Sequence, residues 1–103
     1  MWHPLEELSM PSPYFDTEAR LIVQRNITAN VAGARVAFDP STGDLKLVYY
    51  VFARPSDDDE EWRELAIAEL IAAHPKVRTA SSEFRRCEHM AQDRDGALVF
   101  ERD

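Results

Sequence analysis

Two apolar runs on either side of a cluster of turn-forming residues constrain the fold of this chain more than any other feature. Val31–Phe38 alternates small and larger apolar side chains, and Leu45–Phe52 is rich in β-branched and aromatic residues. The segment between them, Asp39–Asp44, contains Asp, Pro, Ser and Gly, which favour turns for different physical reasons. Because two strands around a short glycine-containing loop form a β-hairpin, we predict that the two runs pair antiparallel.

A helix is predicted directly after the hairpin. Ser56 is a favourable N-cap, and Asp59 stands three residues on, where a capping box places an acidic or amide side chain. The helix should run to about Ala73, because the residue before Pro75 disfavours helical geometry. The stripe expected to pack on the sheet repeats at helical spacing and consists of Trp62, Ala66 and Leu70.

Residues 56–70 carry almost the whole net charge of the chain. They contain seven acidic residues and one arginine, a net of −6 in a chain of −7. Acidic residues favour a helix N-terminus, although two or three would suit that purpose. A focused negative field also attracts basic partners and repels nucleic acid, so the same run could be a binding surface. The sequence leaves both interpretations open, and the lack of a basic stripe argues against a nucleic-acid-binding module.

Further elements are predicted on both sides of this helix. Apolar residues at helical spacing predict a first helix from Thr17 to about Asn26 with Asp16 as N-cap, although its β-branched residues leave a strand as the alternative. The region Val77–Glu88 indicates a third strand with an irregularity at Ser81-Ser82. The chain then closes with a tight turn at Asp95-Gly96 and a fourth strand over residues 97–101.

This order of elements predicts the fold class. The sequence helix-strand-strand-helix-strand-strand indicates an α+β fold, with a mainly antiparallel sheet of about four strands and two helices packed on it. A chain of 103 residues suits one domain with a small core. Residues 1–14 contain three prolines and are predicted as an irregular N-terminal arm, which leaves residues 15–103 as a single α+β domain.

Cysteine usage and hydropathy indicate the compartment. The single cysteine, Cys87, cannot form an internal disulfide, which fits a reducing environment. No apolar run approaches the roughly 20 residues of a membrane-spanning helix. Residues 1–7 lack the basic and apolar regions of a secretory signal. We therefore expect a cytoplasmic protein without membrane contact.

No group of residues predicts a catalytic or metal site. The acidic run is contiguous, whereas a calcium loop spaces its ligands at alternate positions around a central glycine. Cys87 and His89 could supply two zinc ligands, but no second pair stands at a useful spacing. They could act as nucleophile and base only if they meet in space, and a buried structural cysteine is commoner. His74 suits a helix end, where its charged form favours the dipole. We expect no enzyme activity, cofactor or metal.

The adjacent tyrosines of the second predicted strand should point to opposite faces of the sheet. One of Tyr49 and Tyr50 is then expected in the core, and the other is either half-exposed or a contact for a partner, since Tyr is favoured at binding hot spots. The candidate partner-binding residues are therefore Asp57, Asp58, Asp59, Glu60, Glu61, Glu64 and Tyr50.

Residues 17–102 resemble a family of small bacterial proteins, the immunity proteins of contact-dependent inhibition and other polymorphic toxin systems. The matching elements are, in order, the first helix ending near Arg25–Thr28, Asn30-Val31 with the hairpin, the step Ala53–Glu60 into the second helix, its continuation Ala66–Pro75 and the closing segment Gly96–Arg102. The resemblance implies an acidic protein that binds one cognate toxin tightly and blocks it, and it does not imply an enzyme. It carries over no residue of a toxin interface.

Physical reasoning and the resemblance lead to the same expectation. Many toxins of this kind attack nucleic acid and have basic clefts, which an acidic helix end could fill as a phosphate mimic while it steers association. We therefore expect an immunity protein that neutralises a cognate toxin domain by direct occlusion. The alternative is a small acidic adaptor or regulatory subunit that binds a basic protein through the same face or through a sheet edge.

Overall fold

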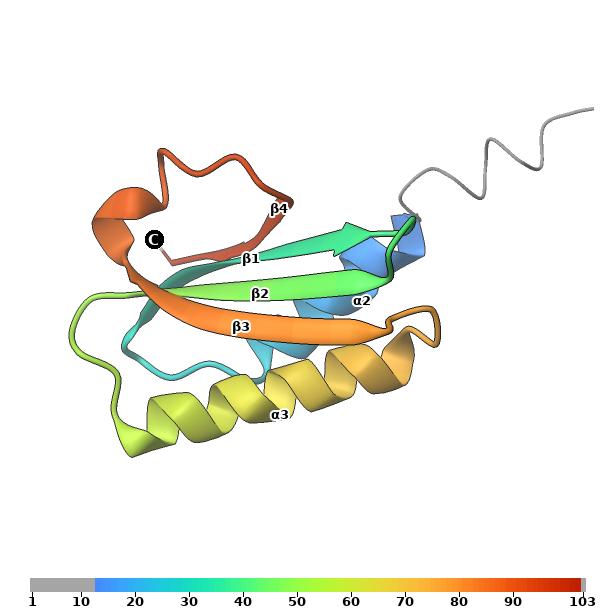
Figure 1. Ribbon diagram of the computed structural model, residues 1–103. Coiled ribbons are helices and arrows are strands. Elements are labelled where there is room, and N and C mark those ends of the chain that lie inside the picture. The colour runs from blue at the N-terminus through green and yellow to red at the C-terminus, as the bar shows by residue number, and fades with distance from the viewer. Residues whose placement is uncertain (1–12, 103) are drawn as a thin grey trace, which may run out of the picture.

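The computed structural model of the protein describes residues 13–102, with side chains from residue 17 onwards. Its elements are the helices α2 (Pro13–Gln24) and α3 (Asp57–Ala73), the short 3-10 helix η1 (Cys87–His89), and the strands β1 (Val31–Asp39), β2 (Asp44–Val51), β3 (Thr79–Arg86) and β4 (Ala97–Glu101) (Figure 1). The α+β class is confirmed, and the elements follow the predicted order with η1 added. The prediction of an irregular arm falls largely on residues 1–12, which lie outside the described part of the chain.

The four strands form one mixed sheet in the order β3-β2-β1-β4. The hairpin is confirmed, since β1 and β2 pair antiparallel along their length, and β4 pairs antiparallel with the other side of β1. β3 instead pairs parallel with β2, so the prediction of a mainly antiparallel sheet holds for two of the three strand pairs. The reason is the connection: α3 carries the chain back along the sheet, and a helical crossover is the usual way to join two parallel strands.

The hairpin loop is closed by the turn chemistry that its sequence indicates. One carboxylate oxygen of Asp39 accepts hydrogen bonds from the backbone N–H of Ser41 at 2.9 Å and from its hydroxyl at 2.7 Å. Gly43 has a φ of 79°, in the left-handed region that favours glycine. Asp39 and Asp44 form the last residue pair of the ladder, so the strands turn over four residues.

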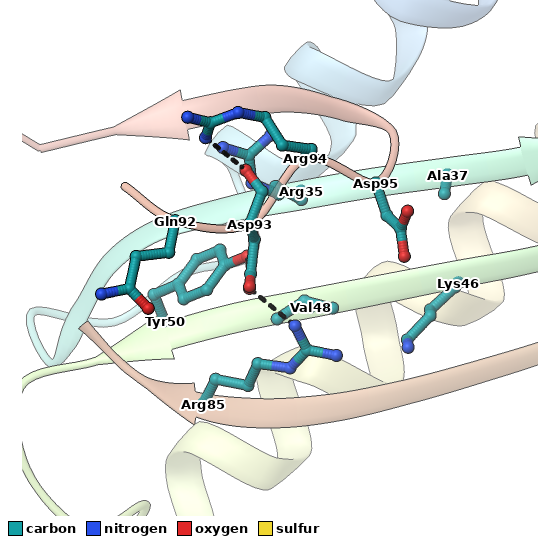
Figure 2. Close-up of a pocket in the computed structure, with 10 residues that line it drawn as sticks. All are labelled: Arg35, Ala37, Lys46, Val48, Tyr50, Arg85, Gln92, Asp93, Arg94 and Asp95. Carbon is teal, nitrogen blue, oxygen red and sulfur yellow. Dashed lines mark hydrogen bonds and ion pairs between the residues drawn. The ribbon is translucent and has the colours of Figure 1, made fainter. Parts of the chain in front are cut away.

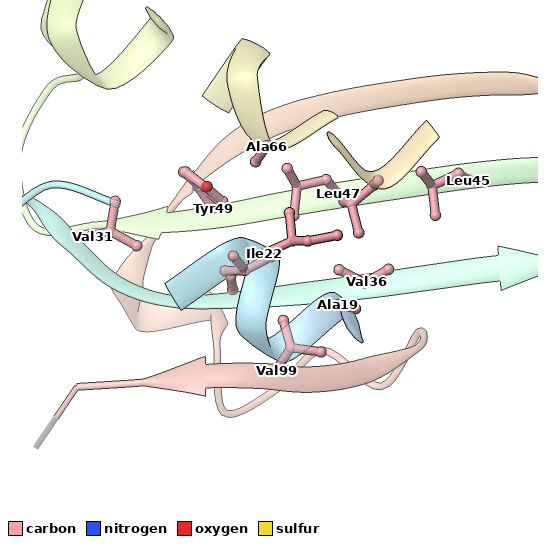
Figure 3. Packing of buried hydrophobic residues seen from close by; sticks show 12 residues of the cluster. Ala19, Ile22, Val31, Val36, Leu45, Leu47, Tyr49, Ala66 and Val99 are labelled. Atoms are coloured by element: carbon pink, nitrogen blue, oxygen red, sulfur yellow. The ribbon is translucent and has the colours of Figure 1, made fainter. Parts of the chain in front are cut away.

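Both helices pack on the same face of the sheet (Figures 1 and 3). Alternation along the strands directs every second side chain to that face. The fully buried members of the cluster come from both helices and all but one of the strands, and they include Ala19, Val23, Val31, Ala34, Leu47, Tyr49, Ala66, Leu70 and Val99. The hydroxyl of Tyr49 donates a hydrogen bond of 2.6 Å to the backbone carbonyl of Asn26, which satisfies both groups inside the core.

The predicted stripe of α3 is confirmed for Ala66 and Leu70 but only in part for Trp62, which is 39% exposed. Arg63 occupies the position nearer to the sheet, with its guanidinium 4.7 Å from the ring centroid of Phe84 in β3. A long arginine stem can cover apolar surface in this way, so the indole lies at the margin of the core.

Three local predictions need correction. α2 begins at Pro13, so Asp16 lies inside the helix rather than at its N-cap, and proline is favoured at a first helical position because its missing N–H would be unsatisfied there. The helix ends at Gln24, before the predicted Asn26, and the strand alternative is wrong. β3 pairs with β2 without a register shift, so no irregularity exists at Ser81-Ser82.

Candidate functional site

The N-terminus of α3 is fixed by a complete capping box. The Ser56 hydroxyl accepts a hydrogen bond of 3.2 Å from the backbone N–H of Asp59, and the Asp59 carboxylate accepts one of 2.8 Å from the backbone N–H of Ser56. The prediction of this cap is confirmed. It satisfies two of the backbone donors that a helix start otherwise leaves unpaired.

Asp59 also joins α3 to the loop between α2 and β1. Its carboxylate accepts hydrogen bonds from the Thr28 hydroxyl and, at 2.9 Å, from the side-chain amide of Asn30. Burial raises the pKa of Asp59, but the hydrogen bonds from Thr28, Ser56 and Asn30 outweigh burial, so the pKa lies below its usual range. Only 3% of Asp59 is exposed, so this member of the predicted binding set is an internal structural residue.

The other acidic residues of this helix start are exposed and define what we call the acidic surface: Asp57, Asp58, Glu60, Glu61 and Glu64. With 3.6 residues per turn, they occupy the outer sides of α3, away from the stripe that contains Ala66 and Leu70. Glu64 pairs with Arg63 at 3.0 Å. The other four acidic residues have no ion pair with the side chains of residues 17–102, so their charges are uncompensated by the described part of the chain.

Large apolar side chains are exposed next to the acidic surface. Trp62 and Leu65 of α3 are 39% and 41% exposed, and Phe52, in the loop that leads into this helix, is 58% exposed. Sequence reasoning placed Trp62 in the core and Phe52 in a strand, so it missed both. The exposure of Phe52 could have been predicted from its position. It is the last residue of the apolar run and follows Val51, where β2 ends.

Tyr50 is not part of an exposed surface. Both Tyr49 and Tyr50 are fully buried, so the expectation that one of them is half-exposed or available to a partner is wrong. Tyr50 points away from the helices, as alternation requires, but the segment between β3 and β4 covers it. Its hydroxyl donates a hydrogen bond of 2.6 Å to Asp93, and burial together with this bond raises the pKa of Tyr50 to about 12.

The remaining candidates from the sequence are Cys87, His89 and His74. Cys87 and His89 lie in η1 rather than in a strand, and Cys87 is partly exposed rather than buried. His74 is the C-cap of α3, as expected, but burial lowers its pKa and so favours the neutral form, although Glu18 opposes this effect. Among the described side chains, those of residues 17–102, no three His, Cys, Asp or Glu gather where they could hold a metal ion.

Neither of the described helices has the length and hydropathy that crossing a membrane requires. A scan against protein-family models and a search of curated proteins find no match to this chain. The resemblance to immunity proteins therefore rests on the sequence pattern.

Proposed function

We propose that this protein is an immunity protein that binds a cognate toxin domain with a basic cleft and blocks it by occlusion. The observation that carries the proposal is the acidic surface itself. Four of its carboxylates, those of Asp57, Asp58, Glu60 and Glu61, are exposed and have no ion pair within the described residues. A helix start needs fewer acids for its own stability, so the excess charge is available to a basic partner.

The position of Asp59 strengthens this argument. Its carboxylate accepts the hydrogen bonds from the backbone N–H of Ser56 and from the side-chain amide of Asn30. The other carboxylates of the first turn are therefore not needed for the cap. The same contacts hold the first turn of α3 against the α2–β1 loop. A rigid arrangement of charges loses little conformational entropy on binding, which favours tight association.

The exposed apolar residues would supply binding affinity, which surface charge alone does not provide. Charged residues at an interface act mainly on the association rate and on specificity, whereas buried aromatic residues commonly dominate affinity. Trp62 and Phe52 are suited to be such anchors because both are large and exposed near the acidic surface. We therefore place Trp62 at the centre of the contact and the acidic residues at its rim.

The test is stopped-flow association with the protein that the adjacent gene encodes, which the proposal expects to be a toxin. The test variant neutralises four rim charges: Asp57→Asn, Asp58→Asn, Glu60→Gln and Glu61→Gln. At low ionic strength, where the Debye length is about 30 Å, association should slow by about tenfold or more, and the difference should shrink near physiological salt, where it is about 8 Å. Trp62→Ala should instead act mainly on dissociation.

A matched control changes the net charge equally but elsewhere on the surface, by Glu18→Gln, Glu88→Gln, Asp95→Asn and Glu101→Gln. Equal slowing by both variants would show that only the net charge matters, and it would reject the acidic surface as the contact. Binding of a basic protein that is not a toxin, with the same sensitivity to the test variant, would favour the adaptor alternative.

A further inference from the structure

A recess lies on the face of the sheet opposite the helices. It encloses about 190 Å³ between the strands and the residues that follow η1 (Figure 2). Its charged lining comes from Arg35 of β1, Lys46 of β2 and Arg85 of β3, together with Asp93, Arg94 and Asp95 of the covering segment. Alternation explains the three strand residues, since each is a sequence neighbour of a residue that packs in the core.

The covering segment is held in place by specific contacts. Arg85 pairs with Asp93 at 2.6 Å, and the same carboxylate oxygen accepts the hydrogen bond from Tyr50 (Figure 2). Gly33 of β1 allows a close approach, because a Cβ there would lie 2.2 Å from the sulfur of Met90. These contacts fix the shape of the recess before any ligand arrives, which lowers the entropic cost of binding.

The recess is locally basic in an acidic protein. Four basic side chains and two acidic ones line it, a net of +2, whereas the whole chain carries −7. Arg85 is compensated by Asp93 and Glu83. Two other basic residues keep unused donors. Lys46 has no ion pair with the described side chains, those of residues 17–102, and the Nε of Arg35 is buried without a hydrogen-bond partner among them.

Arg94 adds a third cation without a carboxylate partner among the described residues. Its guanidinium donates to the backbone carbonyls of Ala91, at 2.7 Å, and Asp93, at 3.1 Å. Arg94 is exposed at the margin of the recess. A buried donor without an acceptor is unusual in a folded protein, and uncompensated cations around one cavity favour an anion.

We propose that this recess binds a dianionic phosphate group, either inorganic phosphate or the phosphate of a small monoester, through Arg35, Lys46 and Arg94. The positive net charge of the lining favours an anionic group. A volume of about 190 Å³ admits a phosphate group, whereas sites for drug-sized ligands usually enclose about 300–1,000 Å³. This inference does not depend on the acidic surface, which lies on α3 beyond the other face of the sheet.

The experiment is a titration of the ¹⁵N-labelled protein with inorganic phosphate at constant ionic strength, with chloride as the reference anion. We expect saturable amide shifts at Arg35, Lys46 and residues 92–95. A parallel titration with phenyl phosphate distinguishes the two sources: tighter binding indicates a monoester, and equal or weaker binding indicates free phosphate. Absence of saturable shifts at the recess for both probes would overturn the proposal.

Two variants assign the donors. Lys46→Gln should fold normally, because Lys46 has no ion pair to lose within the described residues, and it should weaken phosphate binding by about tenfold, the scale of one charged hydrogen bond. Arg35→Gln should weaken it similarly. The control is Lys76→Gln, an equal change of charge at an exposed position between α3 and β3. Equal affinities for Lys46→Gln and Lys76→Gln would show that phosphate binds elsewhere.

Discussion

Replacing Asp59 by alanine should destabilise the protein far more than replacing its neighbour Asp58. Asp59→Ala removes the acceptor for the Thr28 hydroxyl, the Asn30 amide and the Ser56 N–H. A hydrogen bond to a charged group contributes about 1.5–3 kcal/mol, and the loss of a helix cap costs about 0.5–2 kcal/mol. These contributions are not additive, because Asn30 keeps its bond of 3.0 Å to the carbonyl of Ala53 and the freed donors can reach water.

We therefore expect Asp59→Ala to lower the free energy of unfolding by about 3 kcal/mol. The free energy of unfolding of a domain of this size is about 5–15 kcal/mol, so the loss should be measurable by urea denaturation. It should also lower Tm by on the order of 15 °C. Asp58→Ala is the matched control, because Asp58 is exposed and has no ion pair in the described part of the chain. It should cost at most about 0.3–1 kcal/mol through the helix dipole.

The pH dependence gives an independent check. Because the folded-state pKa of Asp59 lies below its usual value of 3.8, the folded protein favours the ionised carboxylate. The stability from Asp59 is then fully present above the unfolded pKa and is lost as the pH falls through the folded pKa. The difference in the free energy of unfolding between the wild type and Asp59→Ala should therefore become smaller below about pH 4. A loss for Asp59→Ala within about 0.5 kcal/mol of the Asp58→Ala value would refute the reasoning.

Three further predictions concern the core, a helix end and a turn. Tyr49→Phe should lower the free energy of unfolding in urea by about 1–2 kcal/mol, since it leaves the buried carbonyl of Asn26 unpaired, and an unchanged value would contradict the hydrogen bond. The lowered pKa of His74 means that the unfolded state binds more protons, so the free energy of unfolding should fall as the pH drops through about 6.5. His74→Gln should reduce the slope of the free energy of unfolding against pH, and equal slopes for variant and wild type would exclude His74 as the cause. Gly96→Ala should lower the free energy of unfolding in urea by more than about 1 kcal/mol, because φ is 73° and a Cβ would lie 2.3 Å from a backbone carbonyl oxygen of β1. A free energy equal to that of the wild type would contradict this.

The elements that follow local rules were predictable from the sequence. The turn residues of Asp39–Asp44 fix the hairpin, and Ser56 with Asp59 fixes the start of α3, because each set acts on residues within a few positions of itself. The parallel pairing of β3 follows no such local rule, since it depends on the path of α3 across the sheet. A helix between two strands is nevertheless the usual signal of a parallel crossover, so the information was present.

The candidate site was predictable to a similar degree. The charge of the acidic surface is a property of its sequence, but the burial of Asp59 depends on Thr28 and Asn30, which are about thirty residues away. The burial of Tyr50 likewise depends on a covering segment that no local pattern assigns to that face. The basic recess could have been inferred in part, because Arg35 and Lys46 alternate with apolar residues on strands that were already paired.

The mixed sheet has a consequence for the order of folding. The hairpin closes a ladder between Asp39 and Asp44, whereas the first parallel pair joins Asp44 to Thr79, thirty-five residues later. Hairpins form in about 1–10 μs, and pairing across a long intervening segment has to overcome its loop-closure entropy first. The hairpin should therefore form early, and β3 should add only after α3 has covered the sheet and shortened the effective loop. In native-state hydrogen exchange, the backbone amides of β1 and β2 should then exchange more slowly than those of β3, the edge strand whose pairing depends on a helix.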